Sequence, residues 1–339
     1  MSRTLVESAV GFGKLLSSSS RSVAQTIEDI IANNVYNIFV ILFLSLFFHL
    51  ESRYNYIMEP KFIFASDIDN TLTGYDYFIP PEVVEYLTSL HVNGYEIVFL
   101  TGRCLSFALL STKAFDIPYY ICVQNGAEVI HMPENTPVIQ YFLQRDILYD
   151  LDLISRDHKD DFFVFSGFES GDFCYYRPDR FSSEILKYFE IAKRFSDGKW
   201  LPIKELSEIQ DEFPLVKFIG DRKEMEIIKE KIIKKRNDLN VILMGDTTDP
   251  AQTILLITHK SADKGKVLEV LCKNNKWKSP VIAAGDSYND ISLLKNANIS
   301  ITMEDAPDEL KKMAHIIAKP STQHGIIAAL QEAAVRLCK

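Results

Sequence analysis

Cysteine is scarce in this chain and follows no binding pattern. The five cysteines among 339 residues, Cys104, Cys122, Cys174, Cys272 and Cys338, are far apart and form no Cys-x-x-Cys pair. An odd number without regular spacing is typical neither of a disulfide framework nor of a cysteine zinc site. We therefore expect a chain from a reducing compartment, and we place it in the cytoplasm.

Basic residues are also in the minority. The chain has 37 lysines and arginines against 46 aspartates and glutamates, which gives a formal net charge of −9. Proteins that bind nucleic acids normally present a basic surface to the phosphates, so no nucleic-acid partner is expected. Hydrophobic residues make up 47% of the chain, which is enough for a full core, and the length is nearer two domains than one.

The N-terminal residues 1–57 differ from the rest because they contain the apolar run "VYNIFVILFLSLFFHL" at 35–50. A membrane-spanning helix needs about twenty apolar residues, and the run lies too far from Met1 for an ordinary secretory signal. Three interpretations stay open. The run is a helix that associates with a membrane and leaves the rest of the chain in the cytoplasm, or a packed interaction helix, or translated upstream sequence. The third follows from Met58, which would be a natural start shortly before the first strand.

From Lys61 onward, strand and helix patterns alternate. Short apolar runs at 61–67 and 95–103 predict strands buried on both faces, and 119–131 predicts a third strand with an Asn-Gly turn. Helices are predicted at 80–94, which opens with prolines and closes at Gly94, and at 104–115. This rhythm predicts an α/β fold, a Rossmann-like doubly wound parallel sheet.

The rhythm breaks between residues 146 and 253. Hairpin-like pieces at 162–168 and 173–178, a strand at 214–220, and helices at 182–195 and 223–235 predict an inserted α+β domain. The parallel pattern then resumes, with helices at 264–275, 289–297 and 324–337 and strands at 280–287 and 299–303. We therefore expect an extension (1–57), a first part of the core (58–145), the insertion (146–253) and a second part of the core (254–339).

Polar side chains stand at or near the carboxyl ends of the predicted core strands, where ligands collect in α/β sheets. They occur in four segments, "DIDNT" from Asp67, "LTGR" around Thr101, "KGKVLEVL" from Lys264 and "GDSYND" around Asp286. Each segment alone is also compatible with an ordinary turn or helix start. Their order and context resemble the four motifs of the haloacid dehalogenase (HAD) superfamily of phosphohydrolases, over the chain from Lys61 to its C-terminus.

This resemblance implies a role for each motif residue. Asp67 would be the nucleophile that forms an aspartyl-phosphate, and Asp69 would protonate the leaving group and then deprotonate water. The backbone carbonyl of Asp69 would also ligate a metal ion, while Thr71 would fix the loop.

The other motifs would hold the phosphoryl group and the metal ion. Thr101, Gly102 and Lys264 would bind phosphate, and Asp286 would join Asp67 and Asp69 as a metal ligand. Asn289 and Asp290 would support that site. Converging carboxylates need a cation, and all-oxygen ligation favours Mg²⁺.

The place of the insertion, after the third strand and between the second and third motifs, resembles the C2-capped type IIB branch, which includes Cof-like and sucrose-phosphate phosphatases. It implies that the insertion is a cap over the core and that the enzyme is a phosphoric monoester hydrolase acting on a small phosphorylated metabolite. Asn70, where the branch more often has glycine, favours a sugar phosphate. Lys217 is a candidate substrate contact in the cap, with Tyr175, Tyr176 and Arg177 as weaker candidates.

Several alternatives stay open. A phosphosugar mutase shares the fold, and a catalytically silent, membrane-tethered binding protein could retain it. Arg103 fits either a phosphate contact or a structural salt bridge, and the acidic segment 244–249 is expected to be a solvated loop. The sequence indicates no particular oligomeric state.

Overall fold

The computed structural model describes residues 59–338 apart from 75–76, 194–198 and 247–250. The extension 1–57, with its apolar run at 35–50, lies outside the described residues. Among the residues that are described, no helix combines the length and the apolar character that crossing a membrane requires. The described residues from Pro60 onward belong to one compact unit.

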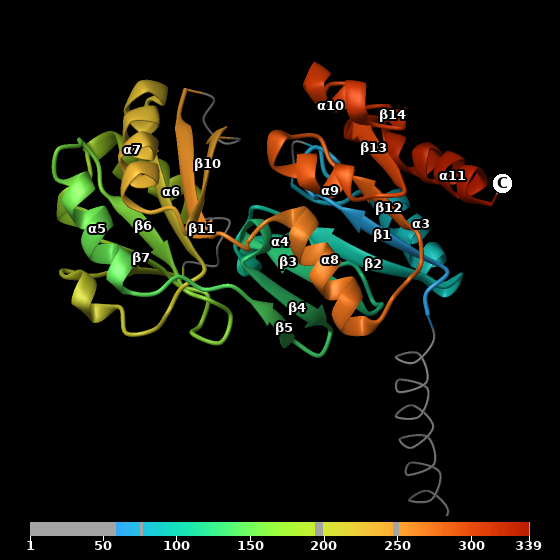
Figure 1. Ribbon diagram of the computed structural model, residues 1–339, viewed down its shortest axis with the longest axis horizontal. Helices are drawn as coiled ribbons and strands as arrows, with labels where there is room; N and C mark the ends of the chain where they lie inside the picture. Colours follow the sequence, from blue (N-terminus) through green and yellow to red (C-terminus); the bar gives the residue numbers. More distant parts are fainter. Residues whose placement is uncertain (1–58, 75–76, 194–198, 247–250, 339) are drawn as a thin grey trace, which may run out of the picture. The chain divides into compact units, whose positions relative to one another are not determined.

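The core contains an eight-stranded sheet in the order β14-β13-β12-β1-β2-β3-β4-β5 (Figure 1). Its strands are β1 (Phe62–Ser66), β2 (Tyr95–Leu100), β3 (Tyr119–Val123), β4 (Glu128–Met132), β5 (Thr136–Gln140), β12 (Val281–Ala284), β13 (Ile299–Met303) and β14 (Ile316–Ala318). The strands from β14 to β3 are parallel, and β4 and β5 add an antiparallel edge. All residues of the central strand β1 are buried, as expected for a strand covered on both faces.

Helices cover this sheet. They are α3 (Pro81–Val92), α4 (Leu105–Thr112), α8 (Lys264–Asn275), α9 (Ile291–Lys295), α10 (Asp308–Met313) and α11 (Gly325–Leu337). Helix α3 contacts α11, while α8 contacts α9 (Figure 1). A Cβ atom on Gly265 would lie 2.5 Å from the backbone of Ser292, so only glycine lets the start of α8 approach α9 this closely.

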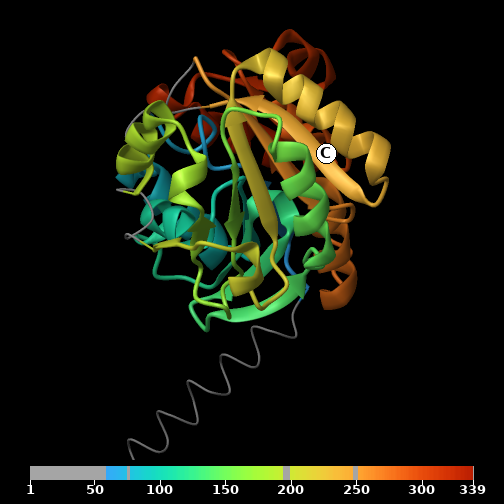
Figure 2. The same cartoon turned by 90° about the vertical axis from the view of Figure 1, so that its left-hand side faces the viewer.

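A second sheet has the order β10-β11-β9-β6-β7-β8 and is formed by residues between the two halves of the core (Figure 2). Its strands are β6 (Phe162–Phe165), β7 (Cys174–Tyr176), β8 (Trp200–Pro202), β9 (Leu215–Gly220), β10 (Leu239–Gly245) and β11 (Thr253–His259). Its helices are α5 (Asp146–Ser155), α6 (Ser183–Ala192) and α7 (Arg222–Lys235). Apolar residues of α5 and α7 form one core with one face of this sheet. We call this sheet with its helices the cap.

The predicted fold class, a Rossmann-like core with an inserted α+β cap, is confirmed. The predicted third strand at 119–131, with its Asn-Gly turn, is a hairpin of β3 and β4, because Gln124, Asn125 and Gly126 all have positive φ and reverse the chain. The predicted cap boundary at 253 falls too early, because β11 pairs with β9 and β10 in the cap sheet.

Candidate active site

Asp67 and Asp286 follow neighbouring parallel strands at the same edge of the core sheet. Asp67 comes directly after β1, and its backbone N–H donates to the carbonyl of Ala284, the last residue of β12, at 2.9 Å. Asp286 lies two residues after Ala284, the end of β12. Parallel pairing therefore brings together carboxylates that are 219 positions apart in sequence number, from 67 to 286.

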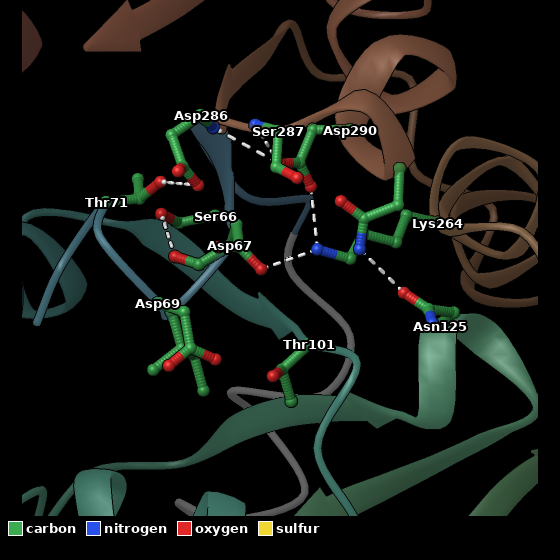
Figure 3. Close-up of polar contacts among 12 residues, drawn as sticks. Ser66, Asp67, Asp69, Thr71, Thr101, Asn125, Lys264, Asp286, Ser287 and Asp290 are labelled. Atoms are coloured by element: carbon green, nitrogen blue, oxygen red, sulfur yellow. Dashed lines mark hydrogen bonds and ion pairs between the residues drawn. The ribbon is translucent and has the colours of Figure 1, made fainter. Parts of the chain in front are cut away.

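Lys264 lies between two carboxylates (Figure 3). It is the first residue of α8, and its Nζ donates to Asp67 Oδ1 at 2.5 Å and to Asp290 Oδ1 at 2.6 Å. The lysine side chain is only 1% exposed. Burial alone would lower its pKa, but Asp290 and Asp67 outweigh burial and raise the pKa above the ordinary range. Lys264 is therefore a permanent positive charge beside the proposed nucleophile.

Asp290 also organises the loop that carries Asp286. Its second carboxylate oxygen accepts the backbone N–H groups of Asp286 at 3.1 Å and Ser287 at 3.0 Å. The Thr71 hydroxyl donates to Asp286 Oδ1 at 3.3 Å, which links the first motif to the fourth. The three side chains Thr71, Asp286 and Asp290 thus hold the two loops together.

Negative charge exceeds positive charge at this point. Asp67, Asp286 and Asp290 each place one carboxylate oxygen within 4.8 Å of the others, and Lys264 is the cation that contacts Asp67 and Asp290. Burial raises the pKa of Asp67, against the opposing effect of Lys264. Burial, with Asp290 as the next cause, raises the pKa of Asp286 to about 7. A hard divalent cation would relieve this repulsion, and carboxylate oxygens are the ligands that Mg²⁺ prefers, so these residues fit a magnesium ion.

Asp69 is held by Arg103. The Arg103 guanidinium donates from Nε to Asp69 Oδ2 at 2.9 Å and from its terminal nitrogen to Asp69 Oδ1 at 2.5 Å. It also donates to the Ser111 hydroxyl and lies 4.0 Å from the ring centroid of Phe107. Of the two interpretations left open for Arg103, the structure thus shows the salt bridge, and a two-point pair of this kind fixes the orientation of Asp69.

Thr101 and Gly102 contact the turn between β3 and β4. The fully buried Thr101 accepts on its hydroxyl from the backbone N–H of Arg103 at 3.1 Å, and its carbonyl accepts from the N–H of Asn125 at 2.9 Å. A Cβ atom on Gly102 would lie 3.4 Å from the Asn125 amide. Asn289 donates to Asn125 Oδ1 at 2.8 Å. Asn125 therefore connects the second and fourth motifs.

Asn125 is a residue that the motif analysis did not assign. It is 1% exposed, it has a left-handed backbone with φ of 58°, and among the described residues its Nδ2 has no hydrogen-bond partner. Buried amide donors are normally satisfied, so this unpartnered group is unusual. The segment "QNG" was the available signal, because consecutive positive-φ positions favour asparagine and glycine.

A cavity of about 450 Å³ runs from these residues to the cap. Core residues that line it include Asp67, Asp69, Asn70, Gly102, Asp286 and Asn289, whereas the lining of the cavity does not include Thr101, Lys264, Thr71 and Asp290. Asn70 has φ of 54°, a conformation that suits glycine or asparagine. This backbone requirement accounts for Asn70 without reference to a sugar.

Lys217 of the cap, the candidate substrate contact, lines the same cavity. Asp246 lines it too and is only 6% exposed, although it belongs to the segment expected to be a solvated loop. The error has a physical cause, because the Tyr188 hydroxyl donates to Asp246 Oδ2 at 2.7 Å and gives the acid a buried partner. The sequence around Asp246 shows neither its burial nor its hydrogen bond with Tyr188.

Arg177 does not line the cavity. Its guanidinium donates to both carboxylate oxygens of Asp161, at 2.6 and 2.8 Å, and to Asp152 at 2.7 Å. Arg177 therefore stabilises the cap internally, and the weaker expectation that it contacts substrate is wrong. Tyr175 and Tyr176 are also outside the cavity lining.

A family profile described as haloacid dehalogenase-like hydrolase matches residues 64–330. The chain is 22% identical over 271 residues to the 5-amino-6-(5-phospho-D-ribitylamino)uracil phosphatase YcsE of Bacillus subtilis, covering 79% of this chain and 94% of that protein. A haloacid dehalogenase-like hydrolase from Bacteroides thetaiotaomicron superposes with a TM-score of 0.67 at 20% identity, over 80% of this chain and 98% of that one. A structure described as a HAD subclass IIB sugar phosphatase superposes with a TM-score of 0.63 at 19% identity, over 80% and 99%.

The profile covers most of the chain, and the superpositions include both the core and the cap. The chain belongs to the haloacid dehalogenase-like hydrolases.

Proposed function

We propose that this protein is a Mg²⁺-dependent phosphatase that hydrolyses a small phosphomonoester through an aspartyl-phosphate on Asp67. The observation that carries the proposal is the contact of the buried Asp67 with Lys264 at 2.5 Å, in a group of three carboxylates. Such a group combines a nucleophile, a fixed positive charge and oxygen ligands.

In the first half-reaction, an Asp67 carboxylate oxygen attacks phosphorus and the bond to the leaving oxygen breaks. For this step Asp69 would be protonated on one carboxylate oxygen, with Arg103 donating to the other, and would pass that proton to the leaving oxygen. The ammonium of Lys264 neutralises the nucleophile and the negative charge that the phosphoryl group carries. Gly102, which lines the cavity, would bind phosphoryl oxygens together with Thr101 and the unpartnered amide of Asn125 beside it.

In the second half-reaction, water attacks the phosphorus of the aspartyl-phosphate. Asp69 takes the proton of this water, and inorganic phosphate leaves with the Asp67 carboxylate restored. Asp67 and Asp286, with the backbone carbonyl of Asp69 and with Asp290 in support, would hold the magnesium ion. When bound, Mg²⁺ supplies charge stabilisation at the phosphoryl oxygens.

The substrate would be a small phosphorylated metabolite rather than a nucleic acid, and a cytoplasmic location agrees with the scarce cysteines. Membrane association through residues 35–50 stays a prediction for the extension. We further propose that the cap runs from residue 146 to the end of β11 at His259, with the core formed by the residues on either side.

The proposal is tested with the full-length protein and p-nitrophenyl phosphate. Phosphate release should require Mg²⁺, stop when a chelator removes the metal, and fall by about 10⁴-fold or more in Asp67→Asn. The exposed Asp305→Asn is the matched control and should retain full activity. Equal rates for Asp67→Asn and the unaltered protein would exclude Asp67 as nucleophile. A phosphosugar mutase would instead transfer phosphate between sugar positions without net release, and a silent binding protein would release none.

A further inference from the structure

The cap sheet turns one face toward its own helices and the other toward the cavity. In β9, Val216 and Phe218 belong to the core formed with α5 and α7, whereas Leu215 and Lys217 line the cavity. This is the ordinary alternation of a strand. The pairing of Lys217 with Leu256 extends the cavity face across neighbouring strands.

That cavity face is mostly apolar. Its carbon-rich residues are Phe165, Trp200, Leu215, Ile242, Met244, Ile254 and Leu256. Leu215, Ile254 and Leu256 form a small hydrophobic cluster of their own, with Phe165, Ile242 and Met244 packed against it. The cluster is separate from the core under α5 and α7. Because the cavity is continuous with Asp67 and Asp69, the group that covers this face is the part of the substrate beyond its phosphate.

Polar groups on the cap side of the cavity include Lys217, Tyr188 and Asp246. Tyr188 donates to Asp246, and Lys217 Nζ lies 3.4 Å from the Tyr188 oxygen and 3.8 Å from Asp246 Oδ2. An ammonium has three donors, and these two contacts employ at most two of them. The third can meet a hydrogen-bond acceptor in the cavity.

We propose that the leaving group of the substrate has an apolar, ring-sized body that covers the cavity face of the cap, with one hydrogen-bond acceptor that reaches Lys217. This inference rests on the proposed function and narrows its substrate class. A bare polyol, such as the sugar of a simple sugar phosphate, would place several hydroxyls against aliphatic side chains that offer them no partners. An apolar body buries its own apolar surface against these side chains, which stabilises the complex, whereas a polyol has little apolar surface to bury.

The test compares three primary alkyl phosphates, so that differences in leaving-group acidity are small. They are 2-phenylethyl phosphate, its para-carboxylate derivative, and ribose 5-phosphate, each assayed with the full-length protein and Mg²⁺. We expect kcat/KM for 2-phenylethyl phosphate to exceed that for ribose 5-phosphate by about tenfold or more, with a further gain of about fivefold from the carboxylate.

Three variants assign these preferences to residues. Ile242→Asn, on the cavity face of β10, should reduce the preference for 2-phenylethyl phosphate over ribose 5-phosphate severalfold. Val241→Asn is its matched control, because the neighbouring side chain packs on the opposite face with the α5 and α7 core, and it should leave the ratio unchanged. Lys217→Met should remove only the gain from the carboxylate. Since each readout is a ratio within one protein, partial loss of folded enzyme does not affect it.

The outcomes separate this inference from the proposed function. If all three esters are hydrolysed with equal efficiency, or ribose 5-phosphate is preferred, the apolar leaving group is wrong while the phosphatase stands. If Lys217→Met keeps the full gain in kcat/KM from the carboxylate, Lys217 is not the group that donates to the acceptor of the substrate. If neither these esters nor p-nitrophenyl phosphate release phosphate with Mg²⁺, the proposed function fails, and this inference fails with it.

Discussion

Lys264 in the core and Lys217 in the cap have pKa values that move in opposite directions. Lys264 touches two carboxylates at 2.5 and 2.6 Å, and its pKa is raised because these acids outweigh its burial. The acid paired with Lys217, Asp246, is 3.8 Å away, and burial lowers the pKa of Lys217 despite that acid. The positive charge of Lys264 is therefore fixed and compensated by its two acids, whereas Lys217 in the cap can still bind a ligand.

The difference between the two lysines reflects a difference between the two walls of the cavity. The core wall carries carboxylates and amides, and by our proposal the phosphate of any phosphomonoester binds against it. The cap wall is mainly apolar with one lysine, and it would meet only the leaving group. Variants of the core should thus affect all substrates alike, while variants of the cap should change the choice between substrates.

The largest expected effect comes from removing the core lysine. Lys264→Met leaves Asp67 and Asp290 buried without their cation, so we expect a loss of about 3–5 kcal/mol in the free energy of unfolding. Activity should fall by about 10³-fold for every ester, since the charge on the phosphoryl group is no longer neutralised. Chemical denaturation and kcat/KM measurements on two unlike esters check both statements.

Lys217→Met is the matched variant in the cap. Its pair with Asp246 is long, at 3.8 Å, and Asp246 keeps the hydrogen bond from Tyr188, so we expect a clearly smaller loss of unfolding free energy than in Lys264→Met. If the two variants were equally destabilised, the distinction between a compensated and an available lysine would be wrong. A loss of activity in Lys264→Met that varied strongly with the ester would contradict the assignment of this lysine to the phosphate.

The core could be predicted from sequence because its features are local. A buried parallel strand is a continuous apolar run, and a functional residue at its end follows in the next position or two, as Asp67 follows β1. The helix beginning at Lys264 and the strand Ile299–Met303 have the predicted starts for the same reason. That Asp67, Thr101 and Asp286 meet could also be predicted, because each follows a parallel strand and the carboxyl ends of parallel strands lie at one edge of the sheet.

The cap wall could not be predicted in this way. Whether Ile242 faces the cavity or the helices depends on pairing register, and a shift by one residue would reverse the answer. Asp246 was misjudged because its partner Tyr188 lies 58 positions away. The sequence contains Arg103 and Asn125 next to a motif or turn, but it does not show what they bind. Their partners, Asp69 and Asn289, lie in other motifs, and only the tertiary fold brings each pair together.

A smaller effect in the core should follow from loosening Asp69. Arg103→Lys keeps the positive charge but loses the two parallel hydrogen bonds to this carboxylate, at 2.5 and 2.9 Å. We expect kcat to fall by about 10–100-fold for every ester, with KM nearly unchanged, because the proton donor is less well placed. Arg156→Lys, an exposed cap position paired with Asp152, is the matched control and should not change kcat. A change in KM alone would assign Arg103 to substrate binding and not to the orientation of Asp69.

The smallest effect concerns alkaline pH, above the range in which Asp286 titrates, and is expected on the cap side. Burial lowers the pKa of Lys217, so as pH rises this ammonium loses its proton before an ordinary lysine does, whereas Lys264 stays charged. KM for a carboxylate-bearing ester should therefore rise a few-fold as pH approaches 10, and KM for the same ester without the carboxylate should stay level. Lys217→Arg should remove the rise, since arginine keeps its proton at this pH. A parallel rise for both esters would place the titrating group on the phosphate side, and the contrast between the two lysines would then not govern substrate binding.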